Sequence, residues 1–243
     1  MAEAQLEVRL LSHTPEALSL IYASFRQCYH AGFVGEMWSR LVEGSISHEE
    51  QADFVAKVVE SGHVSPIEHV SFTFAIQGVS RALTHQLVRH RIASYSQQSQ
   101  RYVDGSNFDY VLPPAIAKNP KAKERFIHCL EEIQTAYREV KGYLEEDGRK
   151  ELSKEDARFL LPQAAETRII VTMNCRSLLN FFTNRCCTRA QWEIRRLADC
   201  MLAECQGVLP VVFRNAGPKC EALKYCPEGK KFTCGRYPLP ERE

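Results

Sequence analysis

Residues 89–102 read Arg-His-Arg-Ile-Ala-Ser-Tyr-Ser-Gln-Gln-Ser-Gln-Arg-Tyr. The stretch holds three arginines, three serines and three glutamines, and it contains no acidic residue. Serine hydroxyls and backbone amides can surround phosphate oxygens while arginines neutralise their charge. Glutamine amides suit the donor and acceptor edges of a heterocyclic ring. Ile92, Ala93 and the two tyrosines indicate a loop that packs against something, unlike a solvated basic loop. The composition therefore favours a site for a small phosphorylated molecule.

Charge is unevenly distributed along the 243-residue chain, although the net charge is only +1. Residues 69–103 and 167–192 contain no Asp, Glu or Lys. Their arginines are Arg81, Arg89, Arg91 and Arg101 in the first segment and Arg168, Arg176, Arg185 and Arg189 in the second. Since each segment carries +4, the rest of the chain carries −7. Arginine is preferred where a planar group grips phosphate or carboxylate at two points. We expect compact anion sites; the alternative is chance clustering on solvated faces.

The segments on either side of this loop show strand and helix patterns. Val70, Phe72, Phe74 and Ile76 alternate with other residues, as in a half-buried strand. Strands are predicted at 5–12, 70–76 and 168–173. Helices are predicted at 14–29 with Thr14 as cap, at 47–62 with Ser47 and Glu50 as a capping box, from Ser80, at 121–146, from Ser153 with Asp156, at 176–183 and at 188–207. These patterns predict an α+β fold.

The helix at 121–146 has the clearest apolar pattern. Its apolar residues follow one another at intervals of three or four: Phe126, Leu130, Ile133, Tyr137, Val140 and Leu144. We expect this stripe to lie in the core or in a subunit interface, without a role in ligand binding.

The composition is that of one globular protein. Hydrophobic residues make up 44% and charged residues 25%, which is ordinary for a globular domain. No apolar run approaches the roughly 20 residues of a membrane helix, and the N-terminus has no apolar signal core. We expect a single domain over 1–243, with a core at about 1–210 and a Cys-, Gly- and Pro-rich tail at 211–243. We expect it in the cytoplasm, with neither membrane nor nucleic acid as a partner.

The loop also resembles a known signature. Arg89, His90, Arg91 and Ser99 match the Arg-His-Arg, seven residues, Ser pattern of the flavin-dependent thymidylate synthases. Three further stretches resemble motifs of that family in the same order: 62–69, 174–181 and 190–194. The resemblance covers about residues 14–210, and four motifs in register are hard to obtain by chance. It implies the fold of that family, a central, mostly antiparallel sheet flanked by long helices.

The resemblance also implies site residues. FAD contacts are expected at His63, Ser65, Arg89, His90, Arg91, Gln97, Asn174, Arg176 and Asn180. Contacts with dUMP are expected at Gln86, Arg89, Gln97, Ser99, Gln100, Arg101, Arg158 and Arg185. Of the second set, Ser99, Gln100 and Arg101 are expected at the phosphate. Arg158 and Arg185 are expected to face dUMP from another subunit of a homotetramer, and Cys28 aligns with a small residue near the flavin.

The activity that the resemblance implies is reductive methylation of dUMP to dTMP for de novo dTMP synthesis. Methylenetetrahydrofolate supplies the carbon, NADPH reduces the FAD, and the flavin supplies the hydride. No cysteine nucleophile is expected. Arg185 is the candidate catalytic residue, because a guanidinium at the uracil carbonyl would stabilise negative charge as the ring becomes nucleophilic.

Three other functions remain as alternatives. A single-stranded nucleic-acid binder could use the arginines and tyrosines of 89–102, but the acidic remainder of the chain speaks against it. A different nucleotide enzyme would need a phosphate loop or metal-binding carboxylates, and the sequence has neither a Gly-x-x-x-x-Gly-Lys-(Ser/Thr) segment nor an aspartate pair near the arginines. A flavin-storage or scaffold protein would have no use for the substrate arginines.

No metal site is expected from the histidines or cysteines. The spacings of His63, His69, His85 and His90 are not those of a common zinc motif. In the tail, Cys220, Cys226 and Cys234 are separated by five and seven residues. Idle surface or oligomer-contact cysteines are favoured there over a zinc site, and the adjacent pair at 186–187 is expected to be buried helix packing.

Overall fold

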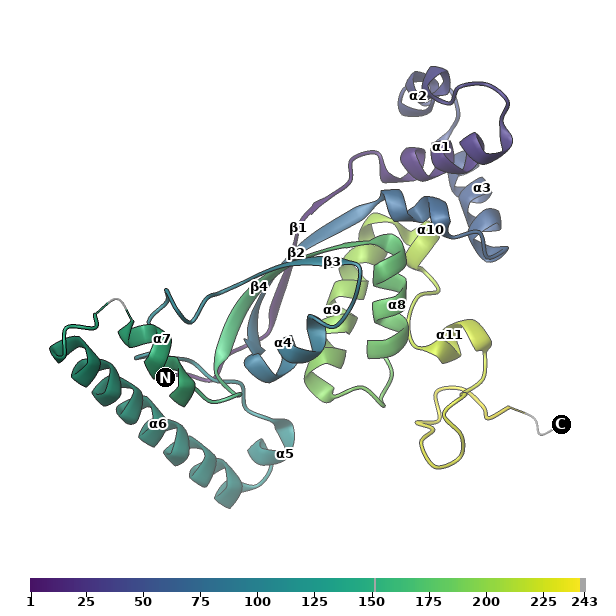
Figure 1. Ribbon diagram of the computed structural model, residues 1–243. Coiled ribbons are helices and arrows are strands. Elements are labelled where there is room, and N and C mark those ends of the chain that lie inside the picture. The colour runs from purple at the N-terminus through teal and green to yellow at the C-terminus, as the bar shows by residue number, and fades with distance from the viewer. Residues whose placement is uncertain (151, 241–243) are drawn as a thin grey trace. The chain divides into compact units, whose positions relative to one another are not determined.

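The computed structural model describes residues 1–150 and 152–240 (Figure 1). The chain divides into two compact units. Unit 1 comprises Met1–Glu7, Ile76–Arg89 and Tyr95–Ile170, and unit 2 comprises Val8–Ala75, His90–Ser94 and Val171–Glu243. Because all four strands contribute residues to both units, the boundary runs through the sheet. The single domain over 1–243 stays a prediction.

A four-stranded sheet has the order β1-β2-β4-β3, with β1 at Glu7–His13, β2 at Ser71–Ser80, β3 at Ala93–Gln97 and β4 at Glu166–Asn174. The Cys175 amide donates to the Val70 carbonyl at 2.8 Å, at one end of the β2–β4 pair. At the other end, the Arg81 amide donates to the Ala165 carbonyl at 3.1 Å. The two strands therefore run antiparallel, and the predicted α+β class with a mostly antiparallel sheet is confirmed.

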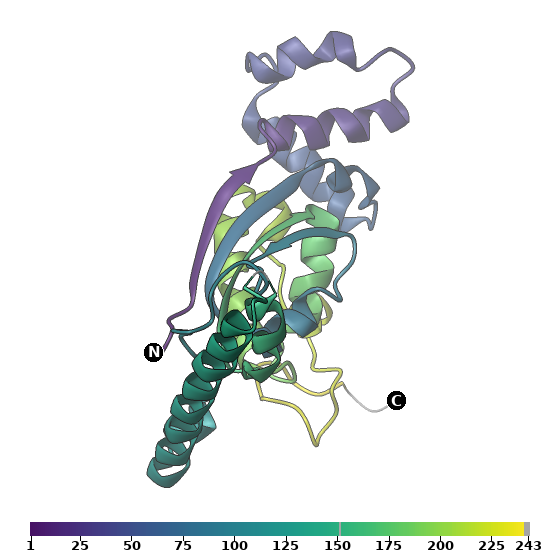
Figure 2. The same cartoon turned by 60° about the vertical axis from the view of Figure 1, so that its left-hand side comes forward.

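Unit 2 holds most of the helices. They are α1 (Ala17–Tyr29), α2 (Gly35–Val42), α3 (His48–Glu60), the 3-10 helix η1 (Ser65–His69), α8 (Cys175–Arg185), α9 (Trp192–Val208), α10 (Pro210–Phe213) and α11 (Lys219–Leu223). Helices α8 and α9 lie side by side (Figures 1 and 2). The Phe213 ring packs edge-on against Phe72 of β2 and Phe182 of α8, with ring centroids 5.7 and 6.0 Å apart. All three rings are fully buried, so this cluster fixes α8 and α10 on the strand.

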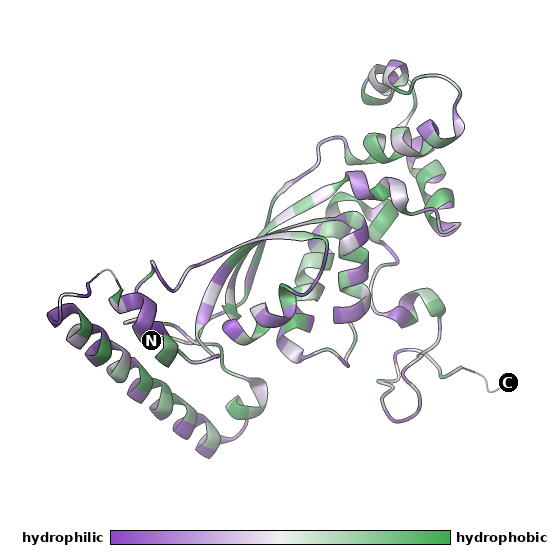
Figure 3. Cartoon of the chain, in the orientation of Figure 1, coloured by the Kyte–Doolittle hydropathy of each residue, from purple (hydrophilic) through white to green (hydrophobic). Residues whose placement is uncertain are grey.

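Unit 1 is built around a long amphipathic helix. Its helices are α4 (Arg81–Leu87), α5 (Pro114–Ala117), α6 (Pro120–Glu146), α7 (Ser153–Ala157) and the 3-10 helix η2 (Arg158–Leu160). Apolar and polar residues share the length of α6 (Figure 3). Leu130 is buried in a cluster with Phe108, Tyr110 and Leu112, whereas Val140 is 37% exposed. The apolar stripe of α6 is therefore core over part of its length only.

The helix caps agree with the sequence at some ends and differ at others. The Ser47 hydroxyl accepts from the Glu50 amide at 3.1 Å, and the Ser80 hydroxyl accepts from the Leu83 amide, as predicted. The Thr14 cap was wrong: α1 begins at Ala17, and the Thr14 hydroxyl accepts from the Ser71 amide of β2 instead. The Ser153 hydroxyl likewise does not cap α7, because it donates to the Lys150 carbonyl. Each hydroxyl forms its hydrogen bond with a backbone group of another segment rather than with an amide of its own helix.

Several stretches carry regular structure that the sequence does not indicate, among them α2, α5 and α10. The loop that follows α4 contains strand β3, whose residues alternate between half-buried and exposed. The Cys-, Gly- and Pro-rich tail, for which no helix was predicted, contains α11. Within the described residues, no helix has both the length and the apolar character needed to cross a membrane.

Candidate functional site

The predicted contact residues divide between the two units. Unit 1 holds Gln86, Arg89, Gln97, Ser99, Gln100, Arg101 and Arg158. Unit 2 holds His63, Ser65, His90, Arg91, Asn174, Arg176, Asn180 and Arg185. All fifteen side chains are half-buried or exposed, so each can reach a ligand from solvent. Except for Arg185, every expected dUMP contact lies in unit 1.

In unit 1, Glu155 of α7 joins two of the predicted arginines. The Arg101 Nε donates to a Glu155 carboxylate oxygen at 3.1 Å. The Arg158 Nε donates to the Glu155 backbone carbonyl, also at 3.1 Å. Ser99 belongs to the same group, because its hydroxyl accepts from the Arg101 amide at 3.2 Å. One chain therefore brings Ser99, Arg101 and Arg158 together. That Arg158 faces dUMP from another subunit, as the resemblance implies, stays a prediction.

Arg81 at the start of α4 adds a further positive charge to this group. Burial lowers the pKa of Arg81, and the nearby positive charge of Arg158 lowers it further. Two guanidiniums that repel each other in a half-buried setting favour an anion between them. The group formed by Arg81, Ser99, Arg101 and Arg158, hereafter the anion cluster, therefore has the composition of a phosphate site.

Gln97 at the end of β3 is held in place by two threonines. Its amide nitrogen donates to the Thr84 hydroxyl at 3.1 Å and to the Thr167 hydroxyl at 3.3 Å. The Tyr95 hydroxyl, on the same strand, donates to the Leu87 carbonyl at 2.8 Å. These contacts fix the strand against α4 and give the Gln97 amide a defined direction.

In unit 2, His90 and Arg185 form a direct contact. The Arg185 Nε donates to the His90 Nε2 at 2.9 Å. The Phe181 ring meets the His90 ring edge-on, with centroids 4.8 Å apart and planes at 89°. Burial lowers the pKa of His90, and the Arg185 charge lowers it further. His90 is therefore neutral near pH 7, which is the state that leaves Nε2 free to accept from arginine.

The remaining residues of unit 2 lie on η1, on α8 and around their ends. Arg176 forms an ion pair with Glu68 of η1, and both side chains are largely exposed. The Asn174 side chain caps α8 by accepting from the Ser177 amide at 2.9 Å. His63 Nδ1 lies 3.3 Å from the Ser61 hydroxyl and 3.5 Å from the Tyr29 hydroxyl.

Four contacting residues were missing from the sequence prediction. Arg81 was counted among the arginines of an acid-free segment but was given no role, although its place at the start of a predicted helix could have pointed to an anion. Glu68 and Phe181 lie inside the motif stretches 62–69 and 174–181 but were given no role. No sequence signal marked Glu155, because its role depends on which segments fold together. The prediction that Ile92 packs against something is not met within the chain, where Ile92 is 80% exposed.

The chain matches proteins of known family over almost its whole length. A family model described as thymidylate synthase complementing protein matches residues 9–211. The chain is 66% identical over 240 residues to a flavin-dependent thymidylate synthase of Nitratidesulfovibrio vulgaris, and the match covers 98% of each chain. It is 49% identical to a flavin-dependent thymidylate synthase of Clostridium tetani, covering 95% of this chain and 94% of the relative. The chain belongs to the flavin-dependent thymidylate synthase family.

A solved structure supports the fold of this thymidylate synthase family member. The structure is that of a UMP/dUMP methylase, PolB, from Streptomyces cacaoi bound with 5-Br dUMP, and it superposes with a TM-score of 0.70. The match covers 88% of this chain and 95% of the other at 19% identity. At that identity the likeness shows the shared fold alone.

The residues of the chain fit a flavin cofactor chemically. Unit 2 offers the exposed guanidiniums of Arg91 and Arg176 for phosphate groups. It also offers the amides of Asn174 and Asn180 for the polar edge of a ring. In the residues that the structure describes, no three His, Cys, Asp or Glu side chains are placed to hold a metal ion.

Proposed function

We propose that this protein catalyses the reductive methylation of dUMP to dTMP, with FAD as cofactor, methylenetetrahydrofolate as carbon donor and NADPH as reductant. The observation that carries the proposal is the 66% identity over 98% of both chains to a flavin-dependent thymidylate synthase. The anion cluster and the His90–Arg185 contact support it, because they supply the two kinds of group that a nucleotide methylation needs: a phosphate anchor and a charge beside the base.

The anion cluster binds the dUMP phosphate in this proposal. Arg101 now pairs with Glu155, and its side chain is about half exposed. A phosphate replaces that carboxylate as the partner of Arg101, and it also relieves the repulsion between Arg81 and Arg158. Ser99, with its hydroxyl beside the Arg101 amide, donates to a phosphate oxygen. Gln100 follows Ser99 directly and completes the phosphate contacts.

The residues next to the cluster orient the base. Gln86 and Arg89 lie at the end of α4 and just after it. Gln97, fixed by Thr84 and Thr167, lies between the uracil and the cofactor in this proposal, with an amide as its polar group. An amide can pair with both donors and acceptors, so Gln97 can serve either ring without carrying a charge.

FAD, when bound, supplies the hydride that reduces the transferred carbon to a methyl group. Arg89, His90, Arg91 and Arg176 are the candidates for holding its phosphates and ring edge, together with His63, Ser65, Gln97, Asn174 and Asn180. His90 donates through its ring N–H while its Nε2 accepts from Arg185. Because Arg176 is exposed and paired only with Glu68 in the described contacts, a phosphate can compete for it without disturbing the core.

Arg185 is the proposed catalytic residue. Its guanidinium has several N–H groups, and the one that faces His90 leaves the others to donate to a uracil carbonyl. A permanent positive charge at that oxygen stabilises the negative charge that develops as C5 attacks the carbon donor. Neutral His90 fixes the guanidinium without competing for a proton.

No cysteine acts as nucleophile in this proposal. Cys175, next to the cap of α8, is fully buried, and burial raises its pKa to about 12. Burial also raises the pKa of Cys186, which follows Arg185 directly. Thiols kept protonated in this way are poor nucleophiles.

We further propose that the active enzyme is a homotetramer in the cytoplasm, with active sites shared between subunits. Large apolar side chains that are exposed within one chain support an assembly: Ile92 is 80% exposed, and Phe159, next to Arg158, is 83% exposed. Ten free cysteines are compatible with a reducing compartment.

The proposal is tested on the purified full-length protein. It should carry flavin with an absorption band at about 450 nm, and NADPH should bleach that band without oxygen, faster when dUMP is present. Adding methylenetetrahydrofolate should then yield dTMP and tetrahydrofolate. A colourless protein that neither binds added FAD nor forms dTMP would overturn the proposal.

A further inference from the structure

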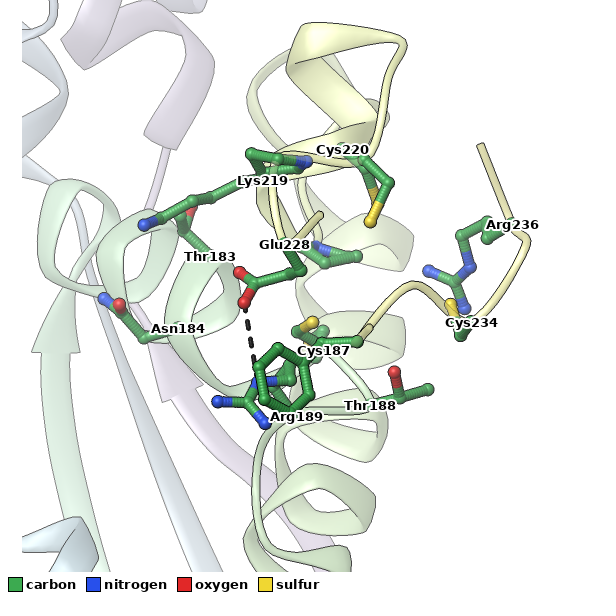
Figure 4. Close-up of a pocket in the computed structure, with 15 residues that line it drawn as sticks. Thr183, Asn184, Cys187, Thr188, Arg189, Lys219, Cys220, Glu228, Cys234 and Arg236 are labelled. Atoms are coloured by element: carbon green, nitrogen blue, oxygen red, sulfur yellow. Dashed lines mark ion pairs between the residues drawn. The ribbon is translucent and has the colours of Figure 1, made fainter. Parts of the chain in front are cut away.

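A cavity in unit 2 is lined by five of the ten cysteines and takes no part in the proposed reaction. It has a volume of about 100 Å³, and its walls come from the turn that follows α8, from α11 and from the tail (Figure 4). Its cysteines are Cys186, Cys187, Cys220, Cys226 and Cys234. Residues 212–243, which supply three of these thiols, lie beyond the stretch that the family model matches. The cavity therefore offers thiol groups that the proposed methylation does not use.

Several contacts hold the tail at this cavity. The Arg189 guanidinium lies 3.9 Å from the centroid of the Phe232 ring and 3.5 Å from the Glu228 carboxylate. The Tyr237 hydroxyl donates to Glu221 at 2.8 Å, and Arg236 pairs with the same carboxylate. The thiols of the tail are therefore brought to the turn after α8 by contacts that need no bond between sulfur atoms.

The thiols differ in their exposure. Cys186, Cys220 and Cys226 are buried, whereas Cys187 is half-buried and Cys234 is exposed. Thr188 brings the two accessible thiols near each other. Its side chain is hydrogen-bonded to the Cys234 sulfur, and Thr188 follows Cys187 directly in the chain. The prediction that Cys187 is buried packing was wrong. Figure 4 shows Cys187 and Cys234 among the residues that line the cavity, on different segments of the chain.

We propose that Cys187 and Cys234 form a thiol–disulfide exchange site that takes a low-molecular-weight disulfide as its oxidant. The Cys234 thiolate attacks one sulfur of that disulfide, forms a mixed disulfide and releases one thiolate. Cys187 then loses its proton and attacks the Cys234 sulfur, which forms the Cys187–Cys234 bond and releases the second thiol. Two protein thiols are oxidised and one disulfide is reduced to two thiols.

The hydrogen bonds around Cys234 indicate that it attacks first and that Cys187 is the resolving thiol. A hydrogen bond from the Arg236 backbone lowers the pKa of Cys234, and the Thr188 side chain lowers it further. The lowered pKa increases the thiolate fraction of Cys234, and the thiolate is the form that the first attack requires. Burial raises the pKa of Cys220, so this thiol is a poorer resolving group.

The bond would tether the tail to the end of α8. Cys187 lies two residues after Arg185, so oxidation would fix the turn that follows the proposed catalytic arginine. Formation of the Cys187–Cys234 disulfide does not depend on the proposed enzymatic activity.

The test uses the full-length protein, freed of reductant and exposed to oxidised glutathione. Trypsin cleavage after Arg185, Arg189, Lys231 and Arg236 yields peptides 186–189 and 232–236. Under non-reducing conditions the two peptides should be found linked, and dithiothreitol should separate them. Cys187→Ser and Cys234→Ser should each abolish the linked species, while Cys28→Ser, which removes an exposed thiol outside the cavity, should leave it unchanged.

Three outcomes would overturn the proposal. In the first, glutathione remains on Cys234 and no link forms. In the second, the link survives in Cys187→Ser, which would assign it to Cys186. In the third, added Zn²⁺ binds one ion per chain through these thiols and blocks oxidation, which would make the cavity a metal site. Near-ultraviolet circular dichroism of each Ser variant should match the unsubstituted protein, so that a lost link is not a lost fold.

Discussion

At the scale of single residues, the contact between Arg185 and neutral His90 carries the proposed chemistry. Replacing Arg185 with Ala removes the charge beside the developing oxyanion while leaving the FAD contacts in place. We expect turnover to fall about 100-fold or more, a loss of several kcal/mol of transition-state stabilisation. Flavin absorbance per chain should stay unchanged. Arg196→Ala, an exposed arginine on α9, serves as the control; near-normal turnover in Arg185→Ala would remove Arg185 from the catalytic role.

The same contact predicts how His90 responds to pH. Its pKa in the folded protein is lowered from 6.5, first by burial and then by Arg185. The unfolded chain therefore binds a proton at His90 at a higher pH than the folded chain does. The stabilisation from the neutral ring is present in full well above pH 6.5, and it is lost as the pH falls below 6.5 through the lowered value.

Nuclear magnetic resonance titration of His90 measures this pKa directly. Arg185→Gln should raise it only in part, because burial, the larger cause, remains. A His90 pKa above 6.5 in the folded protein would contradict the described contact.

Substitution of Ser99 distinguishes a role in binding the dUMP phosphate from a role as a covalent nucleophile. Ser99→Ala removes one hydrogen bond to a charged group, which is worth about 1.5–3 kcal/mol. We expect the KM for dUMP to rise by roughly 10- to 100-fold, with kcat retained at saturating dUMP. The control is Ser96→Ala, an exposed serine of strand β3, which ends two residues before Ser99. Loss of kcat at saturating dUMP would instead favour a nucleophilic serine.

At the scale of elements, two glycines test how backbone conformation shapes the fold. Gly78 in β2 has φ of 71°, and a Cβ there would overlap the Gln5 carbonyl oxygen. Gly142 lies inside α6, where a Cβ meets nothing within 4 Å. Gly78→Ala should therefore lower the free energy of unfolding by more than 1 kcal/mol, from strain and steric overlap. Gly142→Ala should raise it by about 0.5–1 kcal/mol, through helix propensity.

Urea denaturation of the two variants measures both changes. Equal shifts for the two substitutions would show that Gly78 has no special conformation.

The elements also show where sequence reasoning works. Periodicity located β2 and β4 because each strand buries one face along its length. It located α6 because the apolar stripe of that helix follows the helical period, although only part of the stripe is buried. Periodicity missed β3, because Ala93–Gln97 is polar and only half-buried on its inner face, so hydrophobicity does not alternate there. Thr14 was misassigned for a related reason: its hydroxyl serves Ser71, a residue far along the chain that no local pattern identifies.

At the scale of the whole molecule, the motifs predicted which residues belong to the site but not their partners. Arg101 and Arg158 both contact Glu155, and Arg176 contacts Glu68. Arg101 and Glu155, like Arg176 and Glu68, are far apart in the sequence and come together only in the folded chain. Residue types predict phosphate and ring chemistry, because guanidiniums and amides suit those ligands. The pairing of segments depends on packing, which the local sequence does not encode.

A shared active site makes a prediction that no single variant can test. Arg101→Ala and Arg185→Ala should each be nearly inactive, because one weakens the anion cluster and the other removes the catalytic charge. If Arg185 reaches dUMP from a different subunit than Arg101, equal amounts of the two chains, unfolded together and refolded, should form hybrid tetramers. By random assembly, about a quarter of the sites should then contain both intact arginines.

The measured turnover of the mixture should therefore recover to roughly a quarter of the unsubstituted value. Mixing the native variants without exchange of subunits is the control and should stay inactive. Light scattering reports whether the hybrids are tetramers. Tetrameric hybrids that remain inactive would place both arginines in one chain, and the site would then be complete without a partner.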